Sequence, residues 1–569
     1  MRNVLFGLTL FVISPLVSAA DLQFGQGPIQ PSAKLAALAG APEGTLVQLD
    51  AAGLAAFEEG SLVWLPGNAG KAMPARVTRV LAREDGSLDW SARVPGGQTA
   101  SIVVRQGHAF GWIPQPKGAA LRLETRHGQS RIVEEKSSLR PAGPDVLLPP
   151  EPTPAQRAVR KRQESEKAEG TPRLDVLVAY QPSLVEVWGS VAAVQARIAY
   201  LETITNQAYV DTGMDLEIRV VATHLLDFAA TADNVDALYA ITDSSSLEVK
   251  QEIDRVRAMY GADLVKLMRN FDRVNQTSCG VGWLGGYRGN PFVPEYGFSV
   301  TADLGFGGDG CGEWTFAHEI GHNQGAHHDI ETTNGDYGAF EYSRGHRQTI
   351  SADSGFATIM AYNTGPQQRL GRFSDPDLLE CLGQPCGIAE EADNARGIVE
   401  TAAMVAGMVP EVPTGALPML SLDDVQIIEG NSGQRPVRFT LSLSAASASP
   451  VTVNLATRPG SATNTDFAPR TYNILIPAGQ TAVTIDVGVR GDTLMEPDEV
   501  FSLDILSVSG AGVAKGQGVA TIVSDDAIPT LVIDDIEVQE GDDGVRDAVF
   551  TARLSHASNQ NVRFDVEAG

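Results

Sequence analysis

The sequence predicts a multidomain chain in which one α/β domain with a mixed sheet lies between two β-rich regions. Three observations support this prediction. The chain has 569 residues, which is enough for roughly three to four domains of about 150 residues each. Strand-like and helical segments alternate in its central part, and helical periodicity disappears after about residue 412. An internal repeat with a period of 111 positions follows that point.

Composition and charge narrow the class of protein. Apolar residues make up 43% of the chain and charged residues 20%, as in folded globular domains. The formal net charge of −27 argues against a nucleic-acid partner, because such proteins present a basic surface. The acidic balance fits simple solubility and acidic cation sites equally well.

The N-terminus is typical of a signal peptide over residues 1–20. Arg2 gives a positive start, Val4–Val17 is nearly all apolar, and Ser18–Ala20 offers small residues for cleavage. The alternative is a membrane anchor, but this apolar stretch is short for a span of about 20 residues, and no later stretch is suitable. We therefore expect a secreted or cell-surface protein. Export without eukaryotic features suggests a bacterial one.

Residues 21–172 are predicted to be a propeptide-like β-rich region that ends in a charged linker. Apolar and polar residues alternate in segments such as Ser101–Arg105, which indicates strands. Pro141–Pro154 is rich in proline and Arg157–Lys167 is highly charged, a composition typical of linkers. Arg160–Arg162 would be an exposed cleavage site between a propeptide and the next domain. A plain charged linker is the alternative.

Residues 173–412 are predicted to form the α/β domain. A βαβαβ order of elements implies a sheet with parallel strands. A glycine-rich extended segment and one more strand should precede a helix that carries histidines. The expected strands are Leu174–Ala179, Leu216–Val221, Asp263–Met268 and Tyr296–Ala302, the extended segment is Cys279–Gly286, and the helices are Val191–Val210 and Leu247–Tyr260.

The four cysteines suggest two disulfides, because their number is even and the chain is expected to be exported. Three pairings are possible. The simplest joins Cys279 to Cys311 and closes a small loop between Cys381 and Cys386. Zinc ligation by these cysteines is not expected, since no CxxC pair exists and a better site is present.

Four of the nine histidines fall between residues 318 and 328. His318 and His322 are four positions apart, so on a helix they project from one face and can bind one zinc ion. Gly325 can adopt positive φ and end the helix, which allows the chain to bring His328 to the same metal. Three imidazoles leave a fourth position for water, as a catalytic zinc requires.

Glu319 is the candidate catalytic base, because it adjoins His318 and can face that water. Zinc lowers the pKa of its water, and the carboxylate can take the proton and pass it to the leaving amine. Surface histidines on a polar helix are the alternative, but they do not explain five agreeing positions. His327 is one residue short of the required spacing and receives no metal role.

This segment resembles HExxHxxGxxH, the signature of the metzincin metallopeptidases. The resemblance covers roughly residues 173 to 410. It implies that Met360 forms a hydrophobic floor under the zinc ligands. Asp329 resembles the aspartate that braces the active-site turn in the adamalysin (reprolysin) branch, and Tyr362 matches a position that is sometimes a zinc ligand or oxyanion aid. Phe373–Pro376 is similar to bacterial reprolysin-like proteases near the peptidyl-Asp metallopeptidases.

The resemblance also assigns substrate-binding parts. Cys279–Gly286 should be the edge strand to which a substrate adds antiparallel, and its small residues should permit close approach. Arg344 and Arg347 lie in the stretch that forms the S1′ wall, where a basic group would suit an acidic side chain. Two solvated arginines are an equal alternative. Because residues 1–278 contain no cysteine, a propeptide must block the zinc by another group, such as a carboxylate, or by bulk.

Residues 417–527 and 529–569 carry the internal repeat. Leu420–Asp424 matches Leu531–Asp535, and further matches, such as Phe439 with Phe550, are also 111 positions apart. The repeat indicates tandem β-sandwich domains. We expect 529–569 to be the start of an incomplete second copy, and the sequence to be a fragment or to have lost its natural end.

The first repeat resembles a Calx-beta domain. Carboxylates at the ends of its elements would gather at one end of the sandwich and form an oxygen cage that suits Ca²⁺. Solvated turn residues are the alternative. Such modules would be spacers, or would attach the protein to a cell surface or matrix. The candidate calcium ligands are Glu429, Asp466, Asp492, Glu496, Asp525 and Asp526.

The sequence therefore predicts a secreted zinc endopeptidase, made as a zymogen, that acts on proteins or peptides. The first alternative is a cell-surface, calcium-dependent adhesin with a vestigial protease domain. It is disfavoured because the histidines and Glu319 are all present. The second alternative, a calcium-dependent structural protein with an incidental zinc site, would leave Glu319 without purpose.

Overall fold

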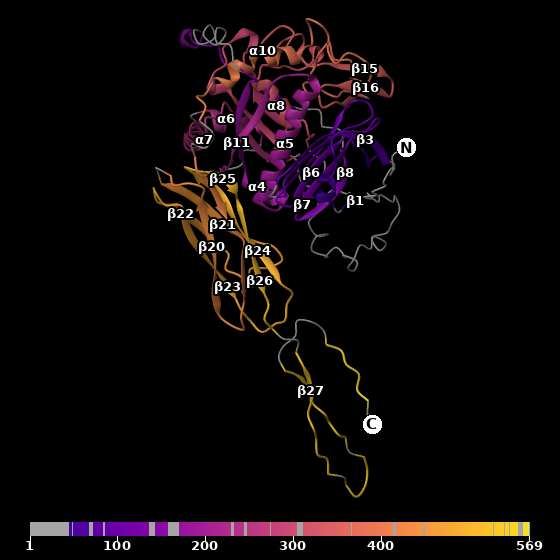
Figure 1. Ribbon diagram of the computed structural model, residues 1–569, viewed down its shortest axis with the longest axis vertical. Helices are drawn as coiled ribbons and strands as arrows, with labels where there is room; N and C mark the ends of the chain where they lie inside the picture. Colours follow the sequence, from indigo (N-terminus) through magenta and orange to yellow (C-terminus); the bar gives the residue numbers. More distant parts are fainter. Residues whose placement is uncertain are drawn as a thin grey trace. The chain divides into compact units, whose positions relative to one another are not determined.

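Figure 1 shows the computed structural model of the protein. The chain divides into two compact units, Met1–Thr414 and Gly415–Gly569, which are described separately. The predicted signal peptide and Arg160–Arg162 lie outside the described residues. The structure describes residues 45–47, 49–67, 72–83, 86–135, 143–157, 170–228, 233–243, 247–272, 275–303, 311–365, 367–412, 417–447, 450–526, 529–539, 541–545, 547–555 and 562–567.

The first unit begins with an eight-stranded antiparallel sheet in the order β1-β8-β7-β6-β5-β4-β3-β2. Alternating apolar side chains of this sheet pack with helix α2 (Ala51–Ala55) into a core that includes Trp90 and Ile102. The strands are β1 (Thr45–Leu46), β2 (Leu62–Pro66), β3 (Ala72–Ala82), β4 (Leu88–Arg93), β5 (Thr99–Arg105), β6 (His108–Ile113), β7 (Leu121–Arg126) and β8 (Gln129–Glu134).

A six-stranded mixed sheet in the order β11-β10-β12-β14-β13-β9 forms the centre of the first unit. Strands β11, β10, β12 and β14 are parallel, β13 is antiparallel to β14, and β9 is parallel to β13. The strands are β9 (Val146–Leu147), β10 (Arg173–Tyr180), β11 (Glu217–Leu225), β12 (Leu264–Asn270), β13 (Gly280–Trp283) and β14 (Phe298–Asp303).

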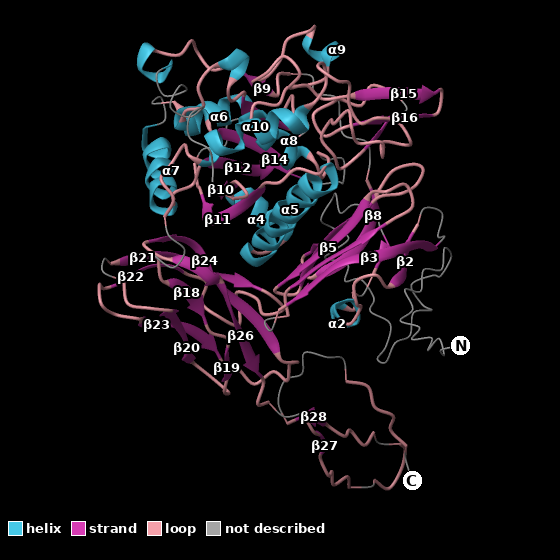
Figure 2. Cartoon of the chain, turned by 45° about the horizontal axis from the view of Figure 1, so that its top comes forward, coloured by secondary structure: helices cyan, strands magenta, loops and turns pink. Residues whose placement is uncertain are grey.

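Helices cover this sheet, as Figure 2 shows. Helix α5 packs on β11 and also on β5 and β6, so it lies between the two sheets of the unit. Helix α8 packs on β13 and β14. The helices are α4 (Pro182–Trp188), α5 (Val191–Thr212), α6 (Asn234–Thr242), α7 (Leu247–Tyr260), α8 (Thr315–Asn323), α9 (Ile330–Thr333) and α10 (Asn394–Ala406).

Two features of this unit differ from the expectation. The proline-rich stretch that we interpreted as a linker contributes β9 to the central sheet, and Asp145 beside it is buried. A proline-rich composition does not prevent a two-residue strand. Such a strand needs only a few backbone hydrogen bonds, and neither Val146 nor Leu147 is a proline. The sequence analysis also missed α4, α6 and α10, and a small sheet of β15 (Arg347–Ser351), β16 (Ser354–Ala357) and β17 (Gln367–Arg369).

The second unit contains a four-stranded sheet, β23-β20-β18-β25, and a five-stranded sheet, β19-β26-β24-β21-β22. Their inward-facing apolar residues share one core, in which the rings of Phe467 and Phe501 stack 4.4 Å apart. The strands are β18 (Met419–Leu422), β19 (Val425–Ile428), β20 (Gln434–Leu443), β21 (Val451–Pro459), β22 (Thr471–Ile476), β23 (Ala482–Arg490), β24 (Glu499–Ser509), β25 (Gly512–Lys515) and β26 (Gln517–Val523).

The second repeat shows little structure of its own. Strands β27 (Leu531–Ile533) and β28 (Ala552–Leu554) pair antiparallel, and none of the described residues from 529 to 567 is buried. The chain as a whole is therefore multidomain and rich in β-structure. Within its described part, no helix has the length and apolar character needed to cross a membrane.

Candidate active site

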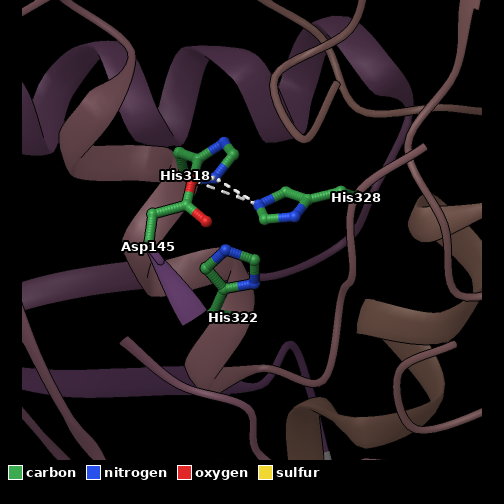
Figure 3. Close-up of side chains that lie close together, drawn as sticks. All are labelled: Asp145, His318, His322 and His328. Carbon is green, nitrogen blue, oxygen red and sulfur yellow. Dashed lines mark hydrogen bonds and ion pairs between the residues drawn. The ribbon is translucent and has the colours of Figure 1, made fainter. Parts of the chain in front are cut away.

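Three histidines and one aspartate form a buried cluster at helix α8 (Figure 3). His318 and His322 project from one face of the helix, and Gly325 (φ +88°) turns the chain so that His328 returns to them. One ligand atom of each histidine and one carboxylate oxygen of Asp145 all lie within 4.8 Å of one another. His327 is outside this cluster: its ring centroid lies 6.2 Å from that of His322, whereas that of His328 lies 4.7 Å away.

The hydrogen bonds of two histidines set their tautomers. Nδ1 of His318 donates to the carbonyl of Ile359 at 2.8 Å, and Nδ1 of His322 donates to the carbonyl of Ala326 at 2.9 Å. Because a carbonyl only accepts, each Nδ1 carries the proton and each Nε2 offers a lone pair to the cluster. Burial lowers the pKa of both His318 and His322, which favours the neutral, metal-binding form.

The spacing of these groups fits a metal ion. Nε2 of His318 lies 3.2 Å from Nε2 of His328. This is close to the roughly 3.3 Å between nitrogens of a tetrahedral zinc with bonds of about 2.0–2.1 Å. Nε2 of His322 is buried and has no hydrogen-bond partner among the described residues. A buried lone pair without a donor is costly, and a cation at the centre of the cluster would satisfy it.

Asp145 is the member of the cluster that the sequence analysis missed. Its carboxylate lies 3.5 Å from Nε2 of His318 and 3.3 Å from Nε2 of His328, and it accepts a hydrogen bond from the Tyr362 hydroxyl. Burial opposes its charge, but the imidazoles of His328 and His318 hold the pKa of Asp145 well below its ordinary value. No pattern around Asp145 distinguishes it from a linker residue, so only the fold reveals it.

Glu319 lies on the same helix, buried beside the cluster. It lines a cavity of about 50 Å³ with Asp145, His318 and Tyr362, and its Oε2 has no hydrogen-bond partner among the described residues. Burial and the Asp145 charge raise the pKa of Glu319 well above its usual range, while Lys266 on β12 acts in the opposite direction. One oxygen of the carboxylate is therefore available for a further partner, in the same cavity that Asp145 and His318 line.

The glycines of β13 make room for helix α8. A Cβ on Gly280 would lie 2.4 Å from Oε1 of Glu319, and one on Gly282 would lie 3.3 Å from Cβ of His322. We had expected these glycines to admit the substrate. Their open side is filled by the helix instead, and this close contact fixes the height of the histidines above the sheet.

Met360 and Asp329 hold in place the elements that carry the three histidines. Met360 is fully buried, and a Cβ on Gly321 of α8 would meet its Sδ at 2.6 Å, so the thioether lies directly against the helix. Asp329 caps α9 by accepting from the Thr332 backbone at 3.1 Å, and its other oxygen accepts from the Tyr362 backbone at 3.2 Å. It thereby joins the third histidine to the turn that carries Met360.

The two arginines of the expected S1′ wall are engaged within the protein. Arg344 is buried and donates to the carbonyls of Gly335 and Asp336 at 2.7 Å each. Arg347 lies 3.2 Å from the carboxylate of Asp329. The alternative of two solvated arginines is therefore wrong. Arg369 on β17, which the sequence analysis did not consider, lines the cavity beside Glu319 and an adjoining cavity of about 730 Å³.

The disulfides follow the pairing that the sequence favours. Cys279–Cys311 connects the start of β13 to the segment before α8, and Cys381–Cys386 closes a small loop. The first of these disulfides lies beside the active-site helix and restrains the segment that leads into it.

Acidic side chains gather at one end of the second unit. Carboxylate oxygens of Asp466, Glu496 and Glu499 lie within 4.8 Å of one another. Burial and the charges of Asp466, Glu496 and Glu429 raise the pKa of Glu499 to about 7. Asp525 accepts a hydrogen bond from the Gly430 backbone at 2.9 Å. Glu499 joins the candidate calcium ligands in this cluster.

The charges of Asp492 and Asp526 act on the same group of carboxylates. Together with burial and Glu496, they raise the pKa of Glu429 above its ordinary value. Mutual repulsion of this kind would be relieved by a bound cation, although exposed acidic groups often occur without one.

A buried three-histidine cluster with a glutamate on the same helix, at the edge of a mixed sheet, defines a metallopeptidase-type site. Residues 171–392 match the model of the reprolysin-like metallopeptidases of family M12B, so this segment is similar to the metallopeptidase domains of that family. This match agrees with the class of enzyme, the α/β domain and the reprolysin branch that the sequence motifs indicated.

Curated relatives are bacterial enzymes named peptidyl-Asp metalloendopeptidase. The protein from Pseudomonas aeruginosa is 30% identical over 277 residues, which cover 44% of this chain and 43% of the relative. The protein from Stenotrophomonas maltophilia is 28% identical, with 59% of this chain and 81% of the relative covered. The protein from Xanthomonas campestris is 27% identical, with 68% of this chain and 85% of the relative covered. The chain thus spans less than half of the first relative and most of the other two.

Two solved structures are similar over parts of the chain. Metalloproteinase-II from Bacteroides fragilis is 11% identical, with 62% of this chain and 95% of that chain covered and a TM-score of 0.37. The apo-form Calx CBD1 domain is 20% identical, with 19% and 99% covered and a TM-score of 0.17. Scores this low carry no argument about fold, which rests on the strand pairings described above.

Proposed function

We propose that this protein is a zinc-dependent endopeptidase in which His318, His322 and His328 hold the metal and Glu319 is the general base. The observation that carries this proposal is the meeting of the histidine nitrogens in one buried cluster. Beside it lies Glu319, whose Oε2 has no hydrogen-bond partner among the described residues. The family match and the relatives support the same class.

The residues divide the work of peptide hydrolysis among them. A bound zinc ion would supply a Lewis acid for the scissile carbonyl and lower the pKa of a water molecule. Glu319 takes the proton from that water and later gives it to the leaving amine. Because Glu319 is buried, its charge acts more strongly than it would in solution.

We further propose a preference for aspartate in the substrate. The relatives carry this preference in their names, and Arg369 is the basic group that lines the cavity beside Glu319. Its Nη1 donates to the Ile359 carbonyl at 2.7 Å, which orients the guanidinium. A guanidinium held in this way can bind a carboxylate through two parallel hydrogen bonds. Arg344 and Arg347 are less suitable because they are not among the residues that line this cavity.

Secretion, a zymogen form and calcium binding complete the proposal. The signal-peptide pattern at 1–20 supports export, and the bacterial relatives support a bacterial protein. The cluster at Asp466, Glu496 and Glu499 supports Ca²⁺ in a Calx-beta-like module at 417–527, with 529–569 as the start of a second. Such modules would hold the enzyme near a cell surface or matrix.

The experiment that tests the enzymatic proposal is cleavage of casein and of a peptide library by the purified protein. It is run before and after limited digestion with trypsin, which is then inhibited, and with and without a zinc chelator. We expect cleavage that the chelator abolishes and that Glu319→Ala removes while zinc content is retained. The exposed Glu295→Gln serves as the control. Zinc-loaded protein that cleaves nothing under any condition would refute the proposal.

A further inference from the structure

Strand β9 occupies the edge of the sheet where a substrate would bind. It pairs with β13, with Val146 opposite Gly282 and Leu147 opposite Trp283. The Gly282 backbone donates to the carbonyl of Asp145 at 3.0 Å, and the Leu284 backbone donates to the carbonyl of Leu147 at 2.9 Å. A substrate that added to this edge would need the same donors, so β9 and a substrate exclude each other.

The direction of β9 is the reverse of the one expected for a substrate. A substrate is expected to run antiparallel to β13, whereas β9 runs parallel to it. As a result the side chain of Asp145, rather than a peptide carbonyl, faces the three histidines (Figure 3). A segment bound in reverse does not present a peptide bond to Glu319 in the orientation that cleavage requires.

Asp145 brings the right chemistry to the metal position. Carboxylate oxygen is one of the ligand types that zinc binds, and a site with three imidazoles keeps a fourth position open. Its oxygen is 3.3 Å from Nε2 of His328, similar to the 3.2 Å between the nitrogens of His318 and His328. The hydrogen bond from the Tyr362 hydroxyl fixes the carboxylate in this position.

The eight-stranded sheet that precedes β9 in the chain packs beside the active-site helix through buried charges. Arg122 on β7 lies 3.5 Å from Glu313, which precedes α8, and Glu313 in turn binds Arg197 of α5 at 2.5 Å. The ring of Trp112 on β6 meets that of Trp314, also before α8, edge to face at 5.0 Å. Breaking such a buried charged network is costly, so the eight-stranded sheet stays packed against the segment that precedes α8.

We propose that Asp145 is the fourth ligand of the metal in the uncleaved chain, and that β9 fills the substrate groove in reverse. The chain is then a latent precursor inhibited by its own carboxylate. This inference rests on the proposed function for its biological meaning, but the ligand itself can be tested without any activity.

The test compares the full chain with Asp145→Asn, which keeps the shape of the side chain, and Asp145→Ala. Glu151→Gln is the matched control, because it removes an acid from the same segment at a side chain that is 88% exposed. Each protein is loaded with Co²⁺ in place of zinc, and its metal content, its visible absorption spectrum and its rate of peptide cleavage are measured.

We expect one bound Co²⁺ per chain throughout, with a changed spectrum in both Asp145 variants and an unchanged spectrum in Glu151→Gln. Cleavage should rise by about tenfold or more in the Asp145 variants. The contact between Asp145 and the metal competes with substrate, and the loss of about 1.4 kcal/mol of that contact gives a factor of ten in rate. Spectra and rates equal to those of the full chain would overturn the inference. A changed spectrum without cleavage in any variant would support the ligand and refute the peptidase proposal instead.

Discussion

Gly280 and Glu319 touch so closely that no side chain fits between them. A Cβ at position 280 would lie 2.4 Å from Oε1 of Glu319 and 2.7 Å from its Cγ. Strand β13 therefore fixes where the proposed base stands relative to the metal ligands on the same helix. This contact links the glycine-rich pattern of β13 to the chemistry of α8.

Gly280→Ala should displace Glu319 while it leaves the histidines able to bind metal. We expect kcat to fall by roughly 100-fold, the loss that a misplacement of about 1 Å can cause. The measurement is peptide cleavage together with zinc content. Gly365→Ala is the control, because a Cβ there would meet nothing closer than 3.5 Å. An active Gly280→Ala enzyme would show that the base is not positioned by this strand.

The histidine helix could be predicted from the sequence because its signals are local. The spacing of His318 and His322 and the glycine at 325 act within a few residues, and the βαβαβ order also depends on short segments. Asp145 and Arg369 could not be predicted. Each reaches the site only through strand pairing, and β9 and β17 are too short to show a periodic pattern. The role of the β13 glycines was misassigned for a related reason, since the sequence does not show which element packs on a strand.

Gly321 and Met360 form a second tight contact, and Gly321→Ala should disturb it. The added Cβ would meet the buried Sδ at 2.6 Å, so we expect a loss of roughly 1–3 kcal/mol in the free energy of unfolding, typical of overpacking. Urea unfolding of Gly321→Ala, Met360→Ala and the double variant measures it. The double variant should be more stable than the sum of the single effects predicts. Strict additivity would mean that the two residues do not contact each other.

Lys266 gives a prediction about pH. Burial lowers the pKa of Lys266 to about 7, although the charge of Glu319 opposes the shift. Between about pH 7 and pH 10.4, the ordinary value for lysine, the unfolded chain binds one more proton than the folded chain at this site. The free energy of unfolding should therefore gain a rising contribution with pH across this window.

Lys266→Met should remove that contribution and stabilise the protein most at the low end of the window. Urea unfolding at several pH values measures the slope. Lys250→Met is the control, because this lysine is only partly buried and pairs with Asp254 on α7. An unchanged slope in Lys266→Met would show that Lys266 keeps its proton in the folded state throughout this range.

Arg369 should determine the proposed preference for aspartate. Arg369→Gln removes the charge that would pair with a substrate carboxylate, and an unpaired carboxylate in the cavity is costly. We expect kcat/KM for an aspartate peptide to fall by roughly 10-fold to 200-fold, with little change for the matched asparagine peptide. The exposed Arg396→Gln is the control. Equal losses for both peptides would assign Arg369 to structure rather than specificity.

Calcium should stabilise the second unit through the acidic cluster. At 100 times its dissociation constant, a ligand that binds only the folded state adds about 2.7 kcal/mol to the free energy of unfolding. We expect Ca²⁺ to raise the unfolding temperature of the unit around residues 417–527. Asp466→Asn and Glu499→Gln should abolish this rise, because they remove two of the clustered carboxylates. Asp486→Asn, which removes an exposed acid paired with Arg438, should retain it.

Magnesium distinguishes a specific site from general screening of repelling charges, since it demands a tighter octahedral geometry. If Mg²⁺ stabilises the unit as strongly as Ca²⁺ does, or if Asp486→Asn loses the effect too, the cluster is a charged surface and not a calcium site.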